Sequence, residues 1–412
     1  MSLFAALRLP REILFGAGQR HALGEVAARL GTRALVCTDA RLAAEPVFEE
    51  MLQHLRQAGL QVQVDSEVLP DVPRDSCADA AERARSFAPD LVIGIGGGSC
   101  LDLAKTVALL LRHGGTPDQY YGEGKVPGPI LPVIAVPTTA GTGSEVTPVA
   151  VLSDPDRTMK VGISSLHLIP SAAICDPELT LTCPPGLTAI TGADALTHAI
   201  EAFTARTREA TPALAQERVF VGKSAITDHF ALLAIGKLAR SLERAVTDGS
   251  SLEARSDVMM GALAAGAAFG TAGTAAAHAI QYPIGTITHT AHGLGVACML
   301  PYVMAYNRPS ITPELARIAR KMGETGPDDA ALADAAVRAV KSLFDRIGIA
   351  PDLRTLGLPE DRLAWTGEQA LTIGRLIDNN PRPFDAASMD RLLRAAYDGR
   401  LDLVPELKRK SS

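Results

Sequence analysis

The stretch Asp90–Lys105, DLVIGIGGGSCLDLAK, joins an apolar run to a helical pattern through three consecutive glycines. DLVIGIG (90–96) is typical of a buried strand, and SCLDLAK is typical of a helix start. Glycines let the backbone approach a phosphate closely, and the N-terminus of the next helix offers free N–H groups. The stretch therefore predicts a strand, a phosphate-sized loop and a helix, although Ser99 stands where the common dinucleotide fingerprint has its last glycine.

A purely structural interpretation of this loop is also open. Ser99 is followed three residues later by Asp102, so the pair is similar to a capping box at the helix start. A second loop, PTTAGTGSEVT (137–147), also follows an apolar strand and is rich in small residues and hydroxyls. Two such loops at one edge of a parallel sheet favour a crevice for a dinucleotide.

The first half of the chain alternates short β-rich runs with helical patterns. This alternation predicts a parallel α/β sheet that binds its ligand at the carboxyl ends of the strands. The expected strands are ALVCT (34–38), VQVDS (62–66), DLVIGIG (90–96) and PVIAVPT (132–138), and the expected helices are VAARLG (26–31), FEEMLQHLRQAG (48–59) and DAAERARSFA (79–88).

The second half changes to long Ala- and Leu-rich segments with helical spacing, such as 228–246 and 329–348. Pro184, Pro185 and Gly186 mark the expected boundary. The sequence predicts an α/β dinucleotide-binding domain over 1–184 and an all-helical domain over 185–412.

Composition favours a small-molecule enzyme. The 412 residues are 47% hydrophobic and carry a formal net charge of −6, so the chain can bury one or two cores and offers no basic footprint for nucleic acid or anionic lipid.

Six scattered cysteines without a C-x-x-C pair, and no signal-like N-terminus, predict a cytoplasmic location. The apolar tract 259–285 is long enough for a membrane span, but it is Ala- and Gly-rich and contains His278 and Gln281, so we expect a buried helix.

An acid at a strand end gives a third clue to the cofactor. Asp39 ends ALVCTD (34–39), where a carboxylate accepts hydrogen bonds from an adenosine ribose and repels a 2′-phosphate. A helix N-cap or turn aspartate is an equally good interpretation.

Histidines and one aspartate in the second half indicate a metal site. Asp194 and His198 are four residues apart and share one helix face, and two further histidines flank HAIQYPIGTITHTAH (278–292). Pro283 should end the first helix near Tyr282, so that the chain doubles back and begins a new helix at 292. One carboxylate and three imidazoles suit Fe²⁺ or Zn²⁺ better than Mg²⁺. From spacing alone, His289 is as good a candidate for the last histidine ligand as His292. A structural interpretation is also open, in which two of the histidines cap helices and Asp194 and His198 form a surface pair.

Four motifs occur in an order that covers nearly the whole chain: GGGSCLDLAK, PTTAGTGSEVT, LTAITGADALTHAIEAF and the H-x13-H of HAIQYPIGTITHTAHG. Together they resemble the iron-containing (group III) alcohol dehydrogenase family. The resemblance implies the dehydroquinate synthase-like fold, in which an N-terminal dinucleotide-binding domain and a C-terminal helical domain hold a divalent metal in the cleft between them.

The resemblance also assigns residues. It places the metal on Asp194, His198, His278 and His292, which excludes His289. It places the pyrophosphate along the first glycine loop, the adenosine half beside the second loop, and Phe269 in the substrate pocket. The implied cofactor contacts are Gly96, Gly97, Gly98, Ser99, Asp102, Thr138, Thr139 and Lys160, in addition to Asp39.

Two departures from the family pattern concern the site. Many relatives have a histidine four residues after the third ligand, where this chain has Tyr282, so a proton relay at that position is in question. The segment 207–227 is longer than expected and is placed to alter the cleft mouth or an oligomer contact.

The predicted function is hydride transfer between NAD(H) and a small, mostly apolar primary alcohol or aldehyde, with His278 and Tyr282 as the catalytic candidates and NAD favoured over NADP by Asp39. A homo-oligomer, most simply a dimer, follows from the resemblance alone. The first alternative is a dehydroquinate-synthase-like lyase, which needs several Lys and Arg residues around the metal, and the segments around the ligands contain none. The second is a relative that binds the cofactor without turnover.

Overall fold

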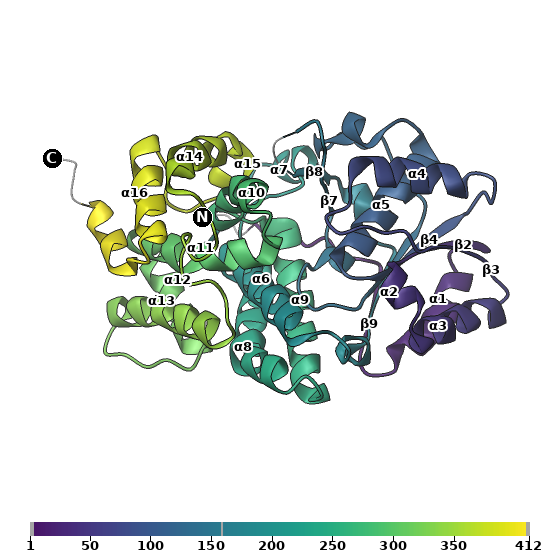
Figure 1. Cartoon of the computed structure of the whole chain (residues 1–412), viewed down its shortest axis with the longest axis horizontal. Helices are drawn as coiled ribbons and strands as arrows, with labels where there is room; N and C mark the ends of the chain where they lie inside the picture. Colours follow the sequence, from purple (N-terminus) through teal and green to yellow (C-terminus); the bar gives the residue numbers. More distant parts are fainter. Residues whose placement is uncertain (1–3, 158–159, 409–412) are drawn as a thin grey trace.

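A six-stranded sheet forms the centre of the first half (Figure 1). The computed structural model describes residues 4–157 and 160–408. All paired strands of this sheet run parallel, in the order β1-β9-β6-β4-β2-β3. Their bounds are β1 Glu12–Phe15, β2 Arg33–Cys37, β3 Gln61–Asp65, β4 Leu91–Gly96, β6 Val133–Pro137 and β9 Ala172–Cys175.

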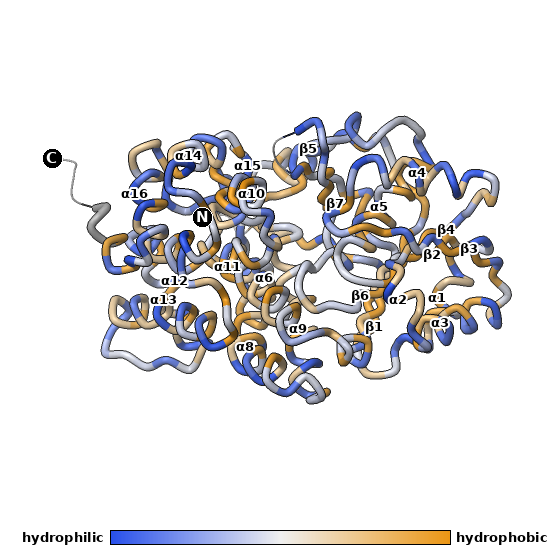
Figure 2. The backbone as a smooth tube through the Cα atoms, in the orientation of Figure 1, coloured by the Kyte–Doolittle hydropathy of each residue, from blue (hydrophilic) through white to orange (hydrophobic). Residues whose placement is uncertain are grey.

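Helices cover both faces of this sheet. One apolar core joins α1 and α3 to the sheet, and another joins α4 and α5 to the opposite face. Because β4 is covered on both sides, all six of its residues are buried and its sequence shows no alternation. Figure 2 shows the hydrophobic colouring along β6 in the same interior. The helix bounds are α1 Leu23–Ala28, α2 Ala40–Ala43, α3 Pro46–Gln57, α4 Arg74–Ala84 and α5 Gly98–His113.

A second, three-stranded sheet lies beyond α5, and the sequence did not predict it. Its order is β5-β8-β7, with β7 and β8 antiparallel. These strands are only two to four residues long, too short for a clear periodic signal. Their bounds are β5 Gly122–Glu123, β7 Val149–Leu152 and β8 Val161–Ser164.

The second half is helical. In the part of the chain that the structure describes, no strand follows β9, and only an isolated bridge pairs Thr207 with Gly222. The predicted fold class is therefore confirmed, whereas the domain division at 184/185 stays a prediction. The helices are α6 Pro185–Thr204, α7 Leu214–Glu217, α8 Ala225–Thr247, α9 Leu252–Ala272, α10 Ala276–Thr288, α11 His292–Asn307, α12 Thr312–Lys321, α13 Asp329–Arg346, α14 Leu363–Thr372, α15 Gly374–Ile377 and α16 Ala386–Tyr397.

The expectation that Pro283 ends its helix is wrong. α10 continues through Pro283 to Thr288 and ends where His289 adopts a left-handed conformation, with φ of 52°. Pro283 and Ile284 are both buried, so packing outweighs the cost of about 3 kcal/mol that an internal proline brings. The expected helix start at His292 is confirmed by α11.

The long apolar tract is divided between α9 and α10, which are bent by 101° relative to each other. Among the described residues, no single helix is long and apolar enough to cross a membrane, although this bent pair passes the same test together. Most residues of both helices are buried within the protein. This burial explains the apolar composition of the tract.

The two halves meet where two glycines face each other. Gly143 precedes the short 3₁₀ helix η3 (Ser144–Val146) and has a φ of 63°, while Gly266 lies on α9. A Cβ on Gly266 would lie 2.9 Å from the Gly143 Cα and 2.7 Å from the Val146 Cγ2. The second glycine loop therefore packs directly against the helix that carries Phe269.

Replacing Gly266 with Ala should lower the free energy of unfolding by about 1–3 kcal/mol, because the added methyl must push η3 away from α9. Urea unfolding would measure the change. Gly236→Ala on α8 is the matched control, since its Cβ would have no neighbour closer than 3.9 Å. Equal stability of the two variants would contradict this account of the contact.

Candidate active site

A cleft of about 660 Å³ lies between the two halves. The loops that follow β2, β4 and β6 form one wall, and residues from α6, α9, α10, α11 and α15 form the other. This is the carboxyl edge of the parallel sheet, where open α/β proteins bind ligands.

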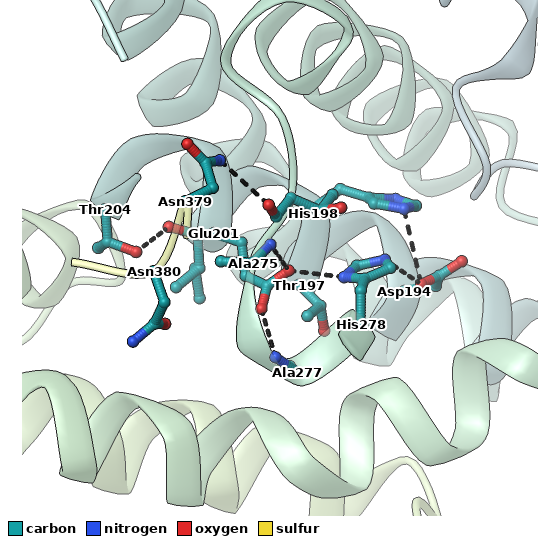
Figure 3. Close-up of polar contacts among 12 residues, drawn as sticks. Asp194, Thr197, His198, Glu201, Thr204, Ala275, Ala277, His278, Asn379 and Asn380 are labelled. Carbon is teal, nitrogen blue, oxygen red and sulfur yellow. Dashed lines mark hydrogen bonds and ion pairs between the residues drawn. The ribbon is translucent and has the colours of Figure 1, made fainter. Parts of the chain in front are cut away.

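Four predicted metal ligands converge at the helical wall. Asp194 and His198 lie one turn apart on α6, His278 lies on α10, and His292 begins α11. The Asp194 Oδ1 atom is 3.7 Å from the His278 Nε2 and 3.9 Å from the His198 Nε2 (Figure 3). The His278 and His292 ring centres are 5.5 Å apart.

The donor atoms of this cluster fit a metal ion. The Asp194 Oδ1 and the His278 Nε2 are buried, and neither has a hydrogen-bond partner among the described residues. One donor atom each from Asp194, His278 and His292 lies within 4.8 Å of the others, with His198 at the edge of the group. Buried polar atoms without partners are costly, and a divalent cation would satisfy them together. A carboxylate with imidazoles suits Fe²⁺ or Zn²⁺.

Burial sets the protonation of these ligands. It raises the pKa of Asp194 to about 6, an effect that the nearby His278 opposes. It also lowers the pKa values of His198 and His292 well below the usual range, with help from the other histidines. These imidazoles are therefore neutral at physiological pH, which is the form that binds a metal.

Glu201, one helical turn beyond His198, orients His278. Its Oε2 is 2.6 Å from the His278 Nδ1, and its two oxygens accept the Ala275 N–H at 2.8 Å and the Ala277 N–H at 2.7 Å (Figure 3). The carboxylate therefore caps the start of α10 and fixes the proton of His278 on Nδ1, which leaves Nε2 free to face Asp194.

Close helix packing brings His292 to the cluster. A Cβ on Gly293 would lie 2.8 Å from the Ile190 carbonyl oxygen and 2.9 Å from the Asp194 Cβ. Because only glycine fits this contact, α11 can approach α6 closely at the residue next to His292.

The first glycine loop supplies an uncapped helix N-terminus to the cleft. Gly97 is the N-cap of α5, and no N-cap side chain bonds to its first turn. The capping-box interpretation of Ser99 is therefore wrong, because Ser99 lies inside the helix. Gly97, Gly98 and Ser99 all line the cleft, so the free N–H groups and the helix dipole are available to an anion. Gly96 instead packs on Cys100, whose Sγ would be 2.4 Å from an added Cβ.

Asp102 joins the two predicted cofactor loops. It accepts the Ser144 hydroxyl at 2.6 Å and the Val151 N–H at 3.0 Å. Lys105, one turn later, donates to the Ser144 hydroxyl and to two backbone carbonyls at 2.8–3.0 Å. Burial raises the pKa of Asp102, with Lys105 opposing, and lowers the pKa of Lys105 to about 8. This network fixes the loops on either side of the cleft relative to each other.

The cleft is also lined by four other predicted cofactor contacts: Asp39, Thr138, Thr139 and Lys160. Asp39 caps α2 by accepting the Leu42 N–H at 2.9 Å on Oδ1. Both interpretations of this aspartate are compatible, because one oxygen caps the helix while the residue lines the cleft. Lys160 also lines the cleft and forms an ion pair with Asp71.

Aromatic residues lie beside the histidines. The Phe269 ring stacks on His198 with centres 4.2 Å apart, and the Tyr282 ring centre is 5.9 Å from that of His292. Both line the cleft. Burial raises the pKa of Tyr282, with the charge of Arg375 opposing this shift. His289 is exposed and lines a neighbouring pocket instead, which argues against it as a ligand.

Residues 10–177 match the family described as iron-containing alcohol dehydrogenase, and residues 188–397 match the C-terminal domain of the same family. The chain belongs to the iron-containing alcohol dehydrogenase family. It is 39% identical to long-chain-alcohol dehydrogenase 1 of Geobacillus thermodenitrificans, over 90% of this chain and 91% of that protein.

Solved structures agree with this family. The crystal structure of a 1,3-propanediol oxidoreductase is similar with a TM-score of 0.89 and 34% identity, covering 96% of this chain and all of that one. The structure of a sulfoacetaldehyde reductase from Bifidobacterium kashiwanohense in complex with NAD⁺ is similar with a TM-score of 0.82 and 29% identity. The match covers 96% of this chain and 99% of that one. The predicted family, fold and enzyme class are confirmed, while the individual residue assignments stay predictions.

The segment 207–227 lies at the cleft of this dehydrogenase. Phe220 lines the cleft, and the Glu123 carboxylate accepts the N–H groups of Val219 and Phe220. Arg8 donates to the Val219 carbonyl at 2.7 Å. These contacts support the predicted role at the cleft mouth.

Sequence reasoning missed three functional candidates. Glu201 had a detectable signal, since it is the only other acid of an apolar helix and lies seven residues after Asp194 on the same face. Lys105 lay in the quoted glycine motif but had no visible partner. Arg375 had no local signal, because it is far in sequence from every motif that the cleft contains.

Replacing His278 or His198 with Ala should greatly reduce bound metal, because each change removes a neutral nitrogen donor. Elemental analysis of purified variants would measure this. His289→Ala is the control and should retain the metal content of the wild type. If His289→Ala lost metal while His292→Ala kept it, the ligand assignment would be wrong.

Glu201→Gln should weaken metal affinity about 10- to 100-fold, because an amide cannot both accept two N–H groups and hold the His278 proton. Competition with a chelator would give the affinity, and a lower Tm should accompany it through loss of the α10 cap. Glu217→Gln on α7 serves as the control for an acid far from His278. Unchanged affinity in Glu201→Gln would show that this carboxylate only stabilises the fold.

Proposed function

We propose that this protein oxidises a small primary alcohol, or reduces the matching aldehyde, with NAD(H) as the hydride carrier and a divalent metal at Asp194, His198, His278 and His292. The unpartnered donor atoms at one end of a cleft whose other end is an uncapped helix N-terminus support this best. A dinucleotide along this cleft would extend from Asp39 toward the histidines.

A divalent metal held by this cluster would supply a Lewis acid for the substrate oxygen. The protein's own residues would then position the donor atoms and exclude water from the site. Glu201 holds the proton on the His278 Nδ1, so that Nε2 stays a lone-pair donor. Phe269, Val149 and Val151 line the cleft with apolar surface that keeps water from the reacting atoms. Tyr282 is the candidate to pass a proton between this interior and water.

The lyase alternative is less well supported. A phosphorylated and carboxylated substrate needs several free cations, and the cationic side chains that line the cleft are Arg41, Lys160 and Arg375. Arg41 lies 3.6 Å from Glu45, and Lys160 is paired with Asp71. Among the described residues that line the cleft, only the cation of Arg375 then lacks an anionic partner, and one such cation is too few for this substrate.

An assay of the purified, metal-loaded protein with NADH and butanal, followed at the NADH absorbance, tests the proposal. We expect turnover that is lost after chelation and recovers when Fe²⁺ or Zn²⁺ is added back. Binding of NADH without consumption of any aldehyde would favour the non-catalytic alternative. Light scattering would test the expected dimer, which, like the cytoplasmic location, stays a prediction.

Asp39→Gly should weaken NAD and admit NADP, with a shift of about 1–3 kcal/mol in relative catalytic efficiency, because it removes both the ribose acceptor and the negative charge. Arg41 would then help to neutralise a 2′-phosphate. Asp39→Asn separates the effects, since asparagine still caps α2 without the charge. An unchanged NAD/NADP ratio in both variants would mean that Asp39 is only a helix cap.

A further inference from the structure

Arg375 lies in the cleft near Tyr282, whose ring neighbours His292. It lies on α15, which packs against α10, and it lines the cleft together with Tyr282 and Phe220. Four residues later, the Asn379 amide donates to the Ala272 and Thr274 carbonyls at 3.0 Å, so this segment is tied to the turn that leads into His278. Figure 3 shows Asn379 beside this turn.

Within residues 4–157 and 160–408, the guanidinium of Arg375 has no anionic partner. Among the described residues, its recorded contact is with Phe220, whose ring centre is 4.6 Å from the guanidinium carbon. Stacking on an aromatic ring orients the planar group while leaving its N–H donors at the edges available. By contrast, the other cleft cations, Arg41 and Lys160, each have a carboxylate nearby.

The acids near Tyr282 already have other partners. Asp102 accepts from Ser144 and Val151, and Glu201 accepts from two backbone N–H groups and His278. Asp194 faces the histidines. A half-buried guanidinium that is oriented by an aromatic ring and has no acid beside it is suited to bind a planar anion with two hydrogen bonds.

The geometry points to Arg375 as a specificity residue that binds an anionic group, a carboxylate or a sulfonate, at the far end of an alcohol or aldehyde substrate. This inference rests on the proposed function and narrows its substrate class. The expectation of a mostly apolar substrate did not take Arg375 into account, although Arg375 lies on the same wall of the cleft as Phe269.

The test compares aldehydes of equal carbon number that differ only in the terminal carboxylate: 3-oxopropanoate with propanal, succinic semialdehyde with butanal, and glutaric semialdehyde with pentanal. The metal-loaded holoenzyme is assayed with NADH as wild type, Arg375→Gln, Arg375→Lys and the control Arg391→Gln. Arg391 is exposed on α16, outside the cleft. Calorimetric titration of 4-hydroxybutyrate into each NADH-bound protein gives a readout independent of turnover.

We expect the wild type to prefer at least one carboxylated aldehyde. Arg375→Gln should lower kcat/KM for that aldehyde about 10- to 100-fold, mainly through KM, while the neutral partner changes little. Arg375→Lys should recover part of the loss, Arg391→Gln should match the wild type, and 4-hydroxybutyrate should bind more weakly to Arg375→Gln alone.

Three outcomes would overturn the inference. The wild type could prefer the neutral aldehyde in every pair, Arg375→Gln could leave the preference unchanged, or it could raise the KM for NADH and not for the aldehyde. Turnover of neutral aldehydes in these cases leaves the proposed function intact. If no aldehyde reacted, the proposed function would fail, and the titration would still decide whether Arg375 binds the carboxylate.

Discussion

The hydrogen bonds of the Glu201 carboxylate connect the helical fold to the chemistry of the cleft. One side chain satisfies the first N–H groups of α10 and the Nδ1 proton of His278. A buried carboxylate is costly unless it is fully hydrogen-bonded, and a buried helix start is costly unless it is capped. The hydrogen bonds between Glu201 and α10 satisfy both groups. The same contacts decide which nitrogen of His278 faces Asp194, and the geometry of the metal cluster follows from how α10 begins.

Close packing on both sides of the cleft maintains this arrangement. Gly293 allows α11 to approach α6 beside Asp194, and Gly143 with Gly266 allows the second glycine loop to contact α9. On the other wall, Asp102, Lys105 and Ser144 tie α5 to that loop. The predicted cofactor loops and the predicted metal ligands therefore belong to one connected set of contacts. Hydride transfer requires such a rigid site, because two reactants must be aligned.

The sequence predicted what local pattern determines. Strand β4 and the shared helix face of Asp194 and His198 follow from periodicity, and the resemblance to a known family chose His292 over His289 as a predicted ligand. Prediction from the sequence failed where tertiary contacts determine the local structure. Pro283 stays helical because its surroundings are buried, Ser99 lies inside a helix rather than capping it, and the short strands β5, β7 and β8 depend on packing. Arg375 lies at the cleft because the Asn379 hydrogen bonds tie its segment to the turn after α9. Residue spacing in the sequence cannot predict such a long-range contact.

The most direct test of this account is an anomalous-diffraction measurement at the iron edge on crystals grown with Fe²⁺ and NAD. We expect one strong peak between Asp194, His198, His278 and His292, with the His278 Nε2 directed at the metal and its Nδ1 still bonded to Glu201. A peak at His289, or a His278 ring turned so that Nδ1 binds the metal, would contradict it.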